Sequence, residues 1–258
     1  MNDENIPIRE SNNCIYHFSH NYEGFVNIFR QKIKPQYCVE DFSSFYGVSS
    51  IYNYENGDTL NIPLKIAQPI FCLCDIPYGR LSVHKKRHGN FGIGFKKEWG
   101  KKNNLNIVSY SHPQSITSAS FRILINYFTK NQKDIIDFEK NYRCFSYIIM
   151  TYKPYEYYEE REWRWIPLYD DILLAIKYNG NEADFKKEID KNQEIINSRD
   201  DIKLDFSIDD IEYIIIDNDK KDKFIEDIKN FYDANDIQKI SKLIDKNNSS
   251  AAPTATAS

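Results

Sequence analysis

Glycines that alternate with apolar residues in the segment 91–95 constrain the fold more strongly than any other feature of the sequence. Phe91, Ile93 and Phe95 are separated by single glycines. Because successive side chains of a β-strand point to opposite faces, the pattern predicts a strand with one apolar face and one face that lacks side chains. We therefore expect another element to pack closely against its backbone. The glycines precede a predicted strand instead of joining a strand to a helix, so they do not match a dinucleotide-binding fingerprint.

The rest of the chain mixes helical and strand patterns without the regular spacing of βαβ units. Asn21 is suited to cap a helix, and the apolar residues after it recur at helical spacing until Pro35. Further helices are predicted at 75–89, 116–127, 182–198, 220–232 and 236–244. Strands are predicted at 15–19, 70–73, 91–95, 107–110, 145–152, 163–168 and 213–216. This mixture predicts one α+β domain at 13–247, with the last helices as an added layer.

The ends of the chain and its overall charge narrow the class of protein. Residues 1–12 are polar and predicted to be flexible, and the small residues of 248–258 predict a disordered tail. The net charge is −4, so the chain lacks the general basic field of many nucleic-acid-binding proteins. It has neither a signal-peptide pattern nor an apolar run of membrane-spanning length, and its five cysteines do not suggest a disulfide scaffold. We expect a cytoplasmic protein with reduced thiols and no membrane association.

A short charged segment contains a candidate catalytic pair, Glu160 and Glu162. On an extended backbone these two carboxylates point the same way, and Arg161 and Arg164 would keep them ionised at neutral pH. Such a pair can stabilise a developing oxocarbenium ion, as glycosyl transfer requires. The same pattern also fits ordinary ion pairs at the end of a strand, next to a buried Trp163.

The first predicted strand contains a second candidate site. His17 and Ser19 are polar, and a capped helix follows them, which suits a site at the edge of a sheet. His17 can hydrogen-bond a ribose or a diphosphate. The alternative is a core histidine that is hydrogen-bonded by the backbone.

The sequence evidence for a metal site is weaker than that for the two candidate sites above. His84 and His88 share one face of a predicted helix, and Cys72 and Cys74 precede them. The Cys-x-Cys spacing is not that of a usual zinc site, and no second cysteine pair follows, so we expect no metal. Buried cysteines and a solvated basic face at 85–88 explain the pattern, and that face can also contact phosphate or an RNA backbone.

Together these stretches resemble the AbiGi family, which is assigned as the antitoxin partner in bacterial abortive-infection phage resistance. The resemblance spans about residues 14–168, and nothing specific to the family is evident after about 170. It is strongest around 72–100, where His88 replaces an expected tyrosine. It implies an anti-phage function and a toxin or antitoxin partner encoded by a neighbouring gene. The stretches that carry it are 16–19, 71–77, His84, 88–100 and 160–164.

The order of an early histidine, a mid-chain strand and a late Glu-x-Glu is also similar to that of ADP-ribosyltransferases. This resemblance implies a split sheet of mixed or antiparallel strands with flanking helices, and a cleft for NAD. His17 would contact the NAD ribose, Glu162 would be catalytic, and Glu160 would orient the acceptor. Tyr16 or a mid-chain aromatic would stack on nicotinamide. The implied residues are catalytic Glu162, Glu160 and His17, and NAD-binding Tyr16, His17, Ser19 and Arg164.

The sequence leaves two main functions open, an enzyme and a non-catalytic binding protein. As an enzyme, it would transfer ADP-ribose from NAD to a protein or RNA acceptor. As a non-catalytic antitoxin or regulatory protein, it would neutralise a toxin by protein–protein binding, and its 19 tyrosines suit such an interface. A third possibility is an RNA-binding module that uses the basic segment 85–87, against which the acidic net charge argues.

Overall fold

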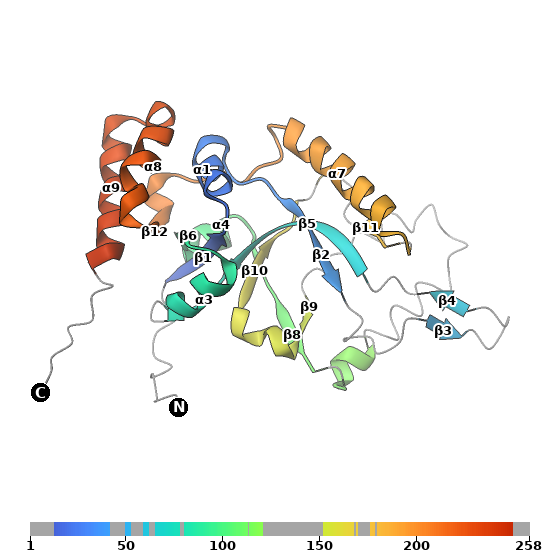
Figure 1. The fold of residues 1–258 in the computed structure, drawn as a ribbon. Helices are drawn as coiled ribbons and strands as arrows, with labels where there is room; N and C mark the ends of the chain where they lie inside the picture. Colours follow the sequence, from blue (N-terminus) through green and yellow to red (C-terminus); the bar gives the residue numbers. More distant parts are fainter. Residues whose placement is uncertain are drawn as a thin grey trace, which may run out of the picture. The chain divides into compact units, whose positions relative to one another are not determined.

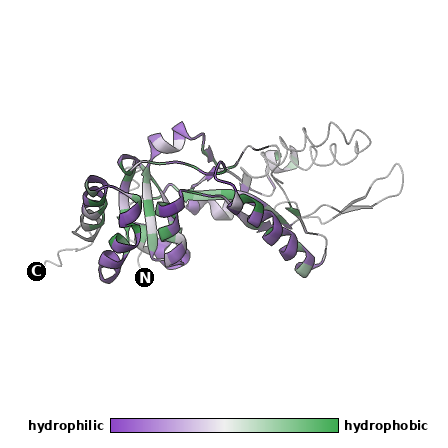
Figure 2. Ribbon diagram, turned by 90° about the horizontal axis from the view of Figure 1, so that it is seen from above, coloured by the Kyte–Doolittle hydropathy of each residue, from purple (hydrophilic) through white to green (hydrophobic). Residues whose placement is uncertain are grey.

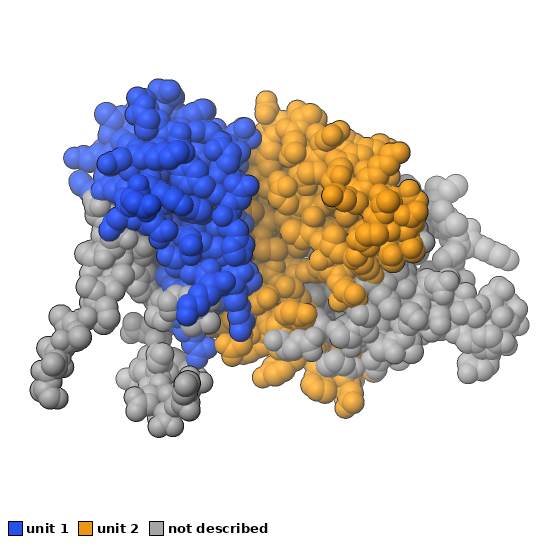
Figure 3. Space-filling model, viewed as in Figure 1, with its two compact units in different colours: residues 1–32, 73–104, 204–258 blue, residues 33–72, 105–203 orange. Residues whose placement is uncertain are grey.

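The protein is described by a computed structural model. The described residues are 13–41, 50–52, 59–61, 65–77, 80–112, 114–120, 152–167, 169, 176–178 and 180–249. The chain divides into two compact units, which Figure 3 colours separately. Unit 1 consists of residues 1–32, 73–104 and 204–258, and unit 2 of residues 33–72 and 105–203.

Unit 1 contains an antiparallel sheet with the strand order β12-β6-β1-β5, to which β5 contributes its last two residues (Figure 1). β1 pairs with β6 along its full length, from Cys14↔Lys96 to Ser19↔Phe91. The elements of unit 1 are β1 (Cys14–Ser19), α1 (Tyr22–Gln31), the end of β5 (Lys65–Cys74), α3 (Leu81–His88), β6 (Phe91–Lys96), α4 (Lys97–Lys102), the 3₁₀ helix η4 (Ile208–Asp210), β12 (Ile211–Ile215), the 3₁₀ helix η5 (Asn218–Lys220), α8 (Lys221–Ile228), the 3₁₀ helix η6 (Lys229–Phe231) and α9 (Ala234–Ser249).

Helix α1 shows how the sequence pattern becomes packing. The Asn21 side chain accepts hydrogen bonds from the backbone N–H groups of Glu23 and Gly24, at 2.9 and 3.3 Å, and so caps the helix as predicted. Its apolar side is buried, and the ring of Phe29 lies 5.0 Å from that of Phe224 in α8. Burial of one such phenylalanine contributes ~2–3 kcal/mol to folding. Figure 2 shows the mixture of hydrophilic and hydrophobic residues along the helices of the chain.

The glycines of β6 accept aromatic rings from β1, as the sequence predicts. Tyr16 lies opposite Gly94, and Phe18 lies opposite Gly92. A Cβ atom added at Gly94 would lie 2.8 Å from Tyr16 Cε1, and one added at Gly92 would lie 2.9 Å from Phe18 Cδ1. Only glycine therefore leaves room for these rings on that face of the strand.

Gly89 ends α3 in a conformation that other residues rarely adopt. Its φ angle is +117°, and a Cβ atom there would lie 2.1 Å from the carbonyl carbon of Ser19 and 2.3 Å from the backbone nitrogen of His20. The neighbouring atoms belong to the backbone and cannot rotate away. Gly89 is thus required both by its torsion angle and by the close approach of β1.

Unit 2 is built around the first part of β5. β2 pairs with it antiparallel from Gln36↔Ile70 to Asp41↔Lys65, β11 pairs with it at Ile176↔Ala67, and β10 is its neighbour in the strand order. The elements of unit 2 are β2 (Gln36–Asp41), β3 (Ser50–Tyr52), β4 (Thr59–Asn61), β5 up to residue 72, β7 (Asn106–Ile107), β8 (Ser109–Ser111), β9 (Tyr152–Pro154), the 3₁₀ helix η3 (Tyr155–Glu160), β10 (Glu162–Trp165), β11 (Ile176–Lys177) and α7 (Glu182–Ser198).

The remaining strand pairs of unit 2 are short. β10 pairs antiparallel with β7, β3 pairs antiparallel with β4, and β8 pairs parallel with β9. Helix α7, capped by Asn181, buries Phe185 against a cluster that includes Ala67 and Ile176.

The structure confirms an α+β fold of mainly antiparallel strands with helices. The helix predicted from Asp75 instead begins at Leu81, because Asp75 is buried and forms an ion pair with Lys97 Nζ at 2.8 Å. α4 and β2 were not predicted. The split sheet of ADP-ribosyltransferases and the single domain at 13–247 stay predictions.

Several predictions fall on residues that the structure does not describe. Segment 1–12 and most of 145–152 lie outside the described residues, and the predicted helix 116–127 is described as helical for 116–120 alone. Helix α9 includes residues 248 and 249 of the predicted tail, and the rest of that tail also lies outside the described part.

Candidate functional site

Strand β10 places two charged side chains inside unit 2. All four of its residues are buried. Because side chains alternate along a strand, Trp163 and Trp165 point to one face while Glu162 and Arg164 point to the other. A buried charge is costly unless it is paired, so this second face needs partners of opposite charge.

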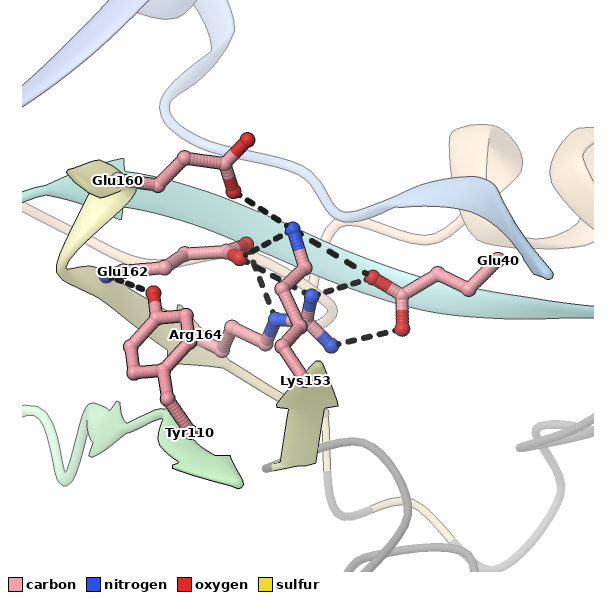
Figure 4. Close-up of polar contacts among 6 residues, drawn as sticks. All are labelled: Glu40, Tyr110, Lys153, Glu160, Glu162 and Arg164. Carbon is pink, nitrogen blue, oxygen red and sulfur yellow. Dashed lines mark hydrogen bonds and ion pairs between the residues drawn. The ribbon is translucent and has the colours of Figure 1, made fainter. Parts of the chain in front are cut away.

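Arg164 is fully buried and lies between two carboxylates (Figure 4). Its Nε donates to Glu162 Oε1 at 2.9 Å, and its Nη2 donates to Glu162 Oε2 at 3.0 Å. On the other side, Nη1 donates to Glu40 Oε2 at 3.0 Å and Nη2 also donates to Glu40 Oε1. Both ends of the guanidinium fork are therefore engaged by the chain itself.

Lys153 is the second cation of this group. Its Nζ lies 2.8 Å from Glu160 Oε2, 2.8 Å from Glu162 Oε2 and 3.9 Å from Glu40 Oε1. We call the five residues Glu40, Lys153, Glu160, Glu162 and Arg164 the buried charge cluster; Glu162 and Arg164 are buried, and the other three are partly buried. With three carboxylates and two cations, the cluster has a formal charge of −1.

Glu160 and Glu162 meet in a different way from the predicted one. Glu160 ends the 3₁₀ helix η3, Glu162 begins β10, and Arg161 between them has a φ angle of +43°. The segment is therefore not extended. The two carboxylates still converge, because both contact Lys153.

Tyr110 of β8 fixes the start of β10 through a hydrogen bond to the backbone. The backbone N–H of Glu162 donates to the Tyr110 hydroxyl oxygen at 2.7 Å, and the backbone N–H of Val108 donates to the Glu162 carbonyl at 2.9 Å. Burial raises the pKa of Tyr110 to about 12, so its hydroxyl stays neutral at physiological pH.

The charges of the cluster stabilise one another. Burial by itself raises the pKa of the Glu162 carboxyl, but Arg164 and Lys153 outweigh that effect and lower the pKa to about 2. Burial lowers the pKa of Lys153, but Glu162 and Glu160 raise it above its usual range. Glu162, Lys153 and Arg164 are consequently all ionised at neutral pH.

Two thiols adjoin the buried charge cluster. Cys38 and Cys72 pack against Ile70 and Ile166 and hydrogen-bond to each other, and Cys72 also hydrogen-bonds to Glu162. The bond to Cys38 and burial together raise the pKa of Cys72, which keeps it a neutral thiol.

The other candidate residues, Tyr16, His17 and Ser19, lie on β1 in unit 1. Tyr16 is buried to 1% exposure and packs between Phe18 and Tyr213. The Ser19 hydroxyl donates to the Asn21 carbonyl at 3.0 Å, which ties it to the start of α1. The structure thus brings together Glu160, Glu162 and Arg164, while the predicted approach of His17 to Glu162 stays a prediction.

The histidines and the basic face of α3 were the remaining candidates. The rings of His84 and His88 stack at 4.6 Å, and His84 is buried. Within the described residues, no group of three or more His, Cys, Asp or Glu side chains is placed to hold a metal ion. Lys86 and Arg87 are exposed, and Lys85 lies 3.9 Å from Asp217, so binding of RNA by this face stays a prediction. No helix in the described ranges combines the length and apolar character needed to cross a membrane.

Glu40, Tyr110 and Lys153 complete the site and were not predicted from the sequence. A signal exists for Lys153, which is the only charge between Arg143 and Glu156 in a segment rich in aromatic and aliphatic residues, whereas Glu40 stands next to Asp41 and has no such signal. A lone charge in such a segment indicates a buried partner of opposite charge. Nothing in the sequence indicates that Tyr110 accepts a backbone hydrogen bond.

Comparisons with known proteins extend these observations. The sequence model of a family described as "Putative abortive phage resistance protein AbiGi, antitoxin" matches residues 31–217, which is more than half of the chain. A protein of Lactococcus lactis subsp. cremoris named "Abortive phage resistance protein AbiGi" is 26% identical over 188 residues, covering 61% of this chain and 75% of that protein. No solved structure matches the chain.

The matched range differs from the one expected from the sequence. It begins at residue 31, so the stretch 16–19 lies outside it. It continues to residue 217, so it includes α7 and residues 171–217, in which no pattern specific to the family was expected.

Proposed function

Because the chain belongs to the AbiGi family of abortive phage resistance proteins, we propose that it is an antitoxin that neutralises a partner toxin by direct protein–protein binding. The family description supplies the antitoxin role. The observation that favours binding over catalysis is the state of Glu162. This carboxylate is 5% exposed, and both of its oxygens are bound by cations of the same chain.

A catalytic carboxylate must reach its substrate, whereas Glu162 faces Arg164 and Lys153. A ribosyl cation would have to displace Lys153 or Arg164 to contact it. The cluster is better suited to hold β10 in place, because a buried ion pair that loses one partner leaves an uncompensated charge. In this proposal Glu160 and Glu162 are structural residues.

The proposal is tested with the toxin encoded by the gene beside that of this chain. Each protein is expressed from its own inducible promoter in a bacterial host. We expect the toxin alone to arrest growth and the chain to restore it, and we expect the purified pair to bind with a Kd of ~1 μM or tighter. Growth arrest by the chain alone, or a failure of the purified pair to bind, contradicts the proposal.

A second candidate function is ADP-ribosyl transfer from NAD. The ionised state of Glu162 favours it, because electrostatic support of an oxocarbenium ion needs a charged carboxylate. The burial of Tyr16 and Arg164 does not fit the NAD contacts assigned to them, since neither side chain has an exposed face. NAD binding therefore stays a prediction, and no catalytic step is derived from it.

Calorimetry with NAD separates the two functions. Under the antitoxin proposal, no heat of binding is expected at millimolar NAD. Micromolar binding that His17→Ala abolishes, with turnover that Glu162→Gln abolishes while the fold is retained, supports the enzyme instead. The circular dichroism spectrum of each variant is the control for its fold.

A further inference from the structure

The 3₁₀ helix η3 exposes three tyrosines on unit 2. Tyr155, Tyr157 and Tyr158 are 56%, 44% and 49% exposed, and we call them the tyrosine surface. The ring centroids of Tyr155 and Tyr158 lie 5.5 Å apart with an interplanar angle of 14°, so the rings stack, and the rings of Tyr158 and Tyr110 meet edge to face with centroids 5.5 Å apart. The rings are therefore already ordered, which lowers the entropy lost when a partner binds.

Exposed large hydrophobic side chains are concentrated in η3. Eight large hydrophobic side chains are exposed among the described residues, and three of them lie within these six residues of η3. Single exposed apolar residues are normal in a soluble protein, but contiguous aromatic ones indicate an interaction site. Tyrosine is also among the residues that most often dominate binding energy at interfaces.

The charge around the tyrosine surface selects the kind of partner. Residues 155–160 contain three glutamates and no lysine or arginine, and the adjoining buried charge cluster has a formal charge of −1. A phosphate backbone would be repelled by this acidic segment, which argues against a nucleic acid. A cationic side chain is attracted both to carboxylates and to the faces of tyrosine rings.

The chain itself shows how a cation is held here. Lys153 Nζ lies 5.3 Å from the centroid of the Tyr157 ring and 2.8 Å from Glu160 Oε2. A ring face and a carboxylate of η3 thus already bind one ammonium group together. The stacked rings of Tyr155 and Tyr158 present further aromatic surface next to it.

We infer that the tyrosine surface binds an arginine- or lysine-bearing segment of the partner toxin, an inference that rests on the antitoxin function proposed above. Arginine fits best, because its planar guanidinium stacks on tyrosine while it donates to a carboxylate. The aromatic rings supply apolar contact area, and the glutamates of η3 supply the complementary charge.

The inference is tested with the full-length chain and the purified toxin from the adjacent gene. The variants are Tyr155→Ala with Tyr157→Ala for the aromatic contacts, and Glu159→Lys for the charge. The matched controls are Phe231→Ala, an aromatic residue of similar exposure in unit 1, and Glu194→Lys, an exposed glutamate of α7. Thermal unfolding of every variant is measured as a control for stability. These residues are exposed, so we expect only small changes in melting temperature. Tyr155→Ala alone is measured as well, because it leaves the contact between Tyr157 and Lys153 in place.

The expected result is a Kd for the toxin that rises at least ~10-fold in the tyrosine double variant and in Glu159→Lys, and less than ~2-fold in the two controls. Retention of toxin binding by both η3 variants overturns this inference and leaves the antitoxin function intact. Absence of toxin binding by the unaltered chain overturns both. If the tyrosine variant loses binding to a single-stranded RNA probe but still binds the toxin, the surface is assigned to nucleic acid. If the unaltered chain self-associates and the tyrosine variant does not, the surface is assigned to a second copy of the chain. Either outcome overturns the inference.

Discussion

At the scale of single residues, the contacts of Glu162 make it the residue of the cluster with the clearest structural role. Arg164 and Lys153 compensate the cost of its burial, and they do so only while Glu162 is charged. The substitution Glu162→Gln preserves the shape of the side chain and removes that charge. It therefore leaves two buried cations with one carboxylate fewer.

We predict that Glu162→Gln lowers the free energy of unfolding at pH 7 by about 3 kcal/mol, since the pKa of Glu162 falls from an ordinary value of 4.5 to about 2 on folding. Urea denaturation measures this loss. Glu159→Gln is the control, because Glu159 is a neighbouring exposed residue and its loss should change stability little. Equal stability of the Glu162 variant and the natural chain would contradict the structural role.

The pH dependence follows from the direction of the same shift. A carboxyl whose pKa is lower in the folded state stabilises the fold above its unfolded pKa, and that contribution disappears as the pH falls through the folded value. The difference in stability between the natural chain and Glu162→Gln should therefore be largest above pH 4.5 and shrink toward pH 2. A difference that stays constant over this range would show that the variant acts through packing instead.

At the scale of elements, the junction of α3 with β1 depends on Gly89. Gly89 and Gly180 both have positive φ angles, but a Cβ atom meets backbone only at Gly89 and has open space within 4 Å at Gly180. We predict that Gly89→Ala lowers the free energy of unfolding by more than ~3 kcal/mol, and Gly180→Ala by only ~1 kcal/mol, the cost of torsional strain. Urea denaturation of the two variants compares them directly. Equal losses would mean that the close approach to Ser19 relaxes easily.

Elements with local signals could be predicted from the sequence, and elements without them could not. Residues 182–198 were predicted as a helix and form α7 with these bounds, because the apolar stripe of the helix is a local feature. The helix predicted from Asp75 was wrong in its start, since a capping residue has no such role when a distant lysine pairs with it. β2 was missed because its pairing with β5 is a long-range contact.

The candidate site was also predictable only where its residues are close in sequence. Glu160, Glu162 and Arg164 are close in sequence, and their clustering was expected. Glu40 and Lys153 come from distant segments, and nothing local links them to β10. The positive φ of Arg161, which turns the chain between the two glutamates, also has no clear sequence signal.

At the scale of the whole molecule, the chain is acidic, and its proposed contact surface is acidic as well. The net charge is −4. Association with a cationic partner should then be accelerated by long-range attraction, which salt screens. We predict that the association rate with the toxin falls ~10-fold between 0.05 and 0.5 M NaCl, as measured by stopped-flow or surface plasmon resonance.

Glu159→Lys serves as the internal comparison for that measurement, because it should flatten the salt dependence, and Glu194→Lys should flatten it less. A rate that does not change with salt would show that apolar contacts alone drive the association.

The left-handed turn at Arg161 separates two parts of the chain that should tolerate substitution differently. On one side, Tyr155 is 56% exposed and should be replaceable with little loss of stability, whereas Tyr157 and Tyr158 also contact Lys153 and Tyr110. On the other side, a change in β10 must be matched at Glu40 or Lys153 to keep the buried charges balanced. The proposed contact surface can therefore be altered by a single substitution at Tyr155, while the adjoining strand β10 can be altered only through coordinated pairs.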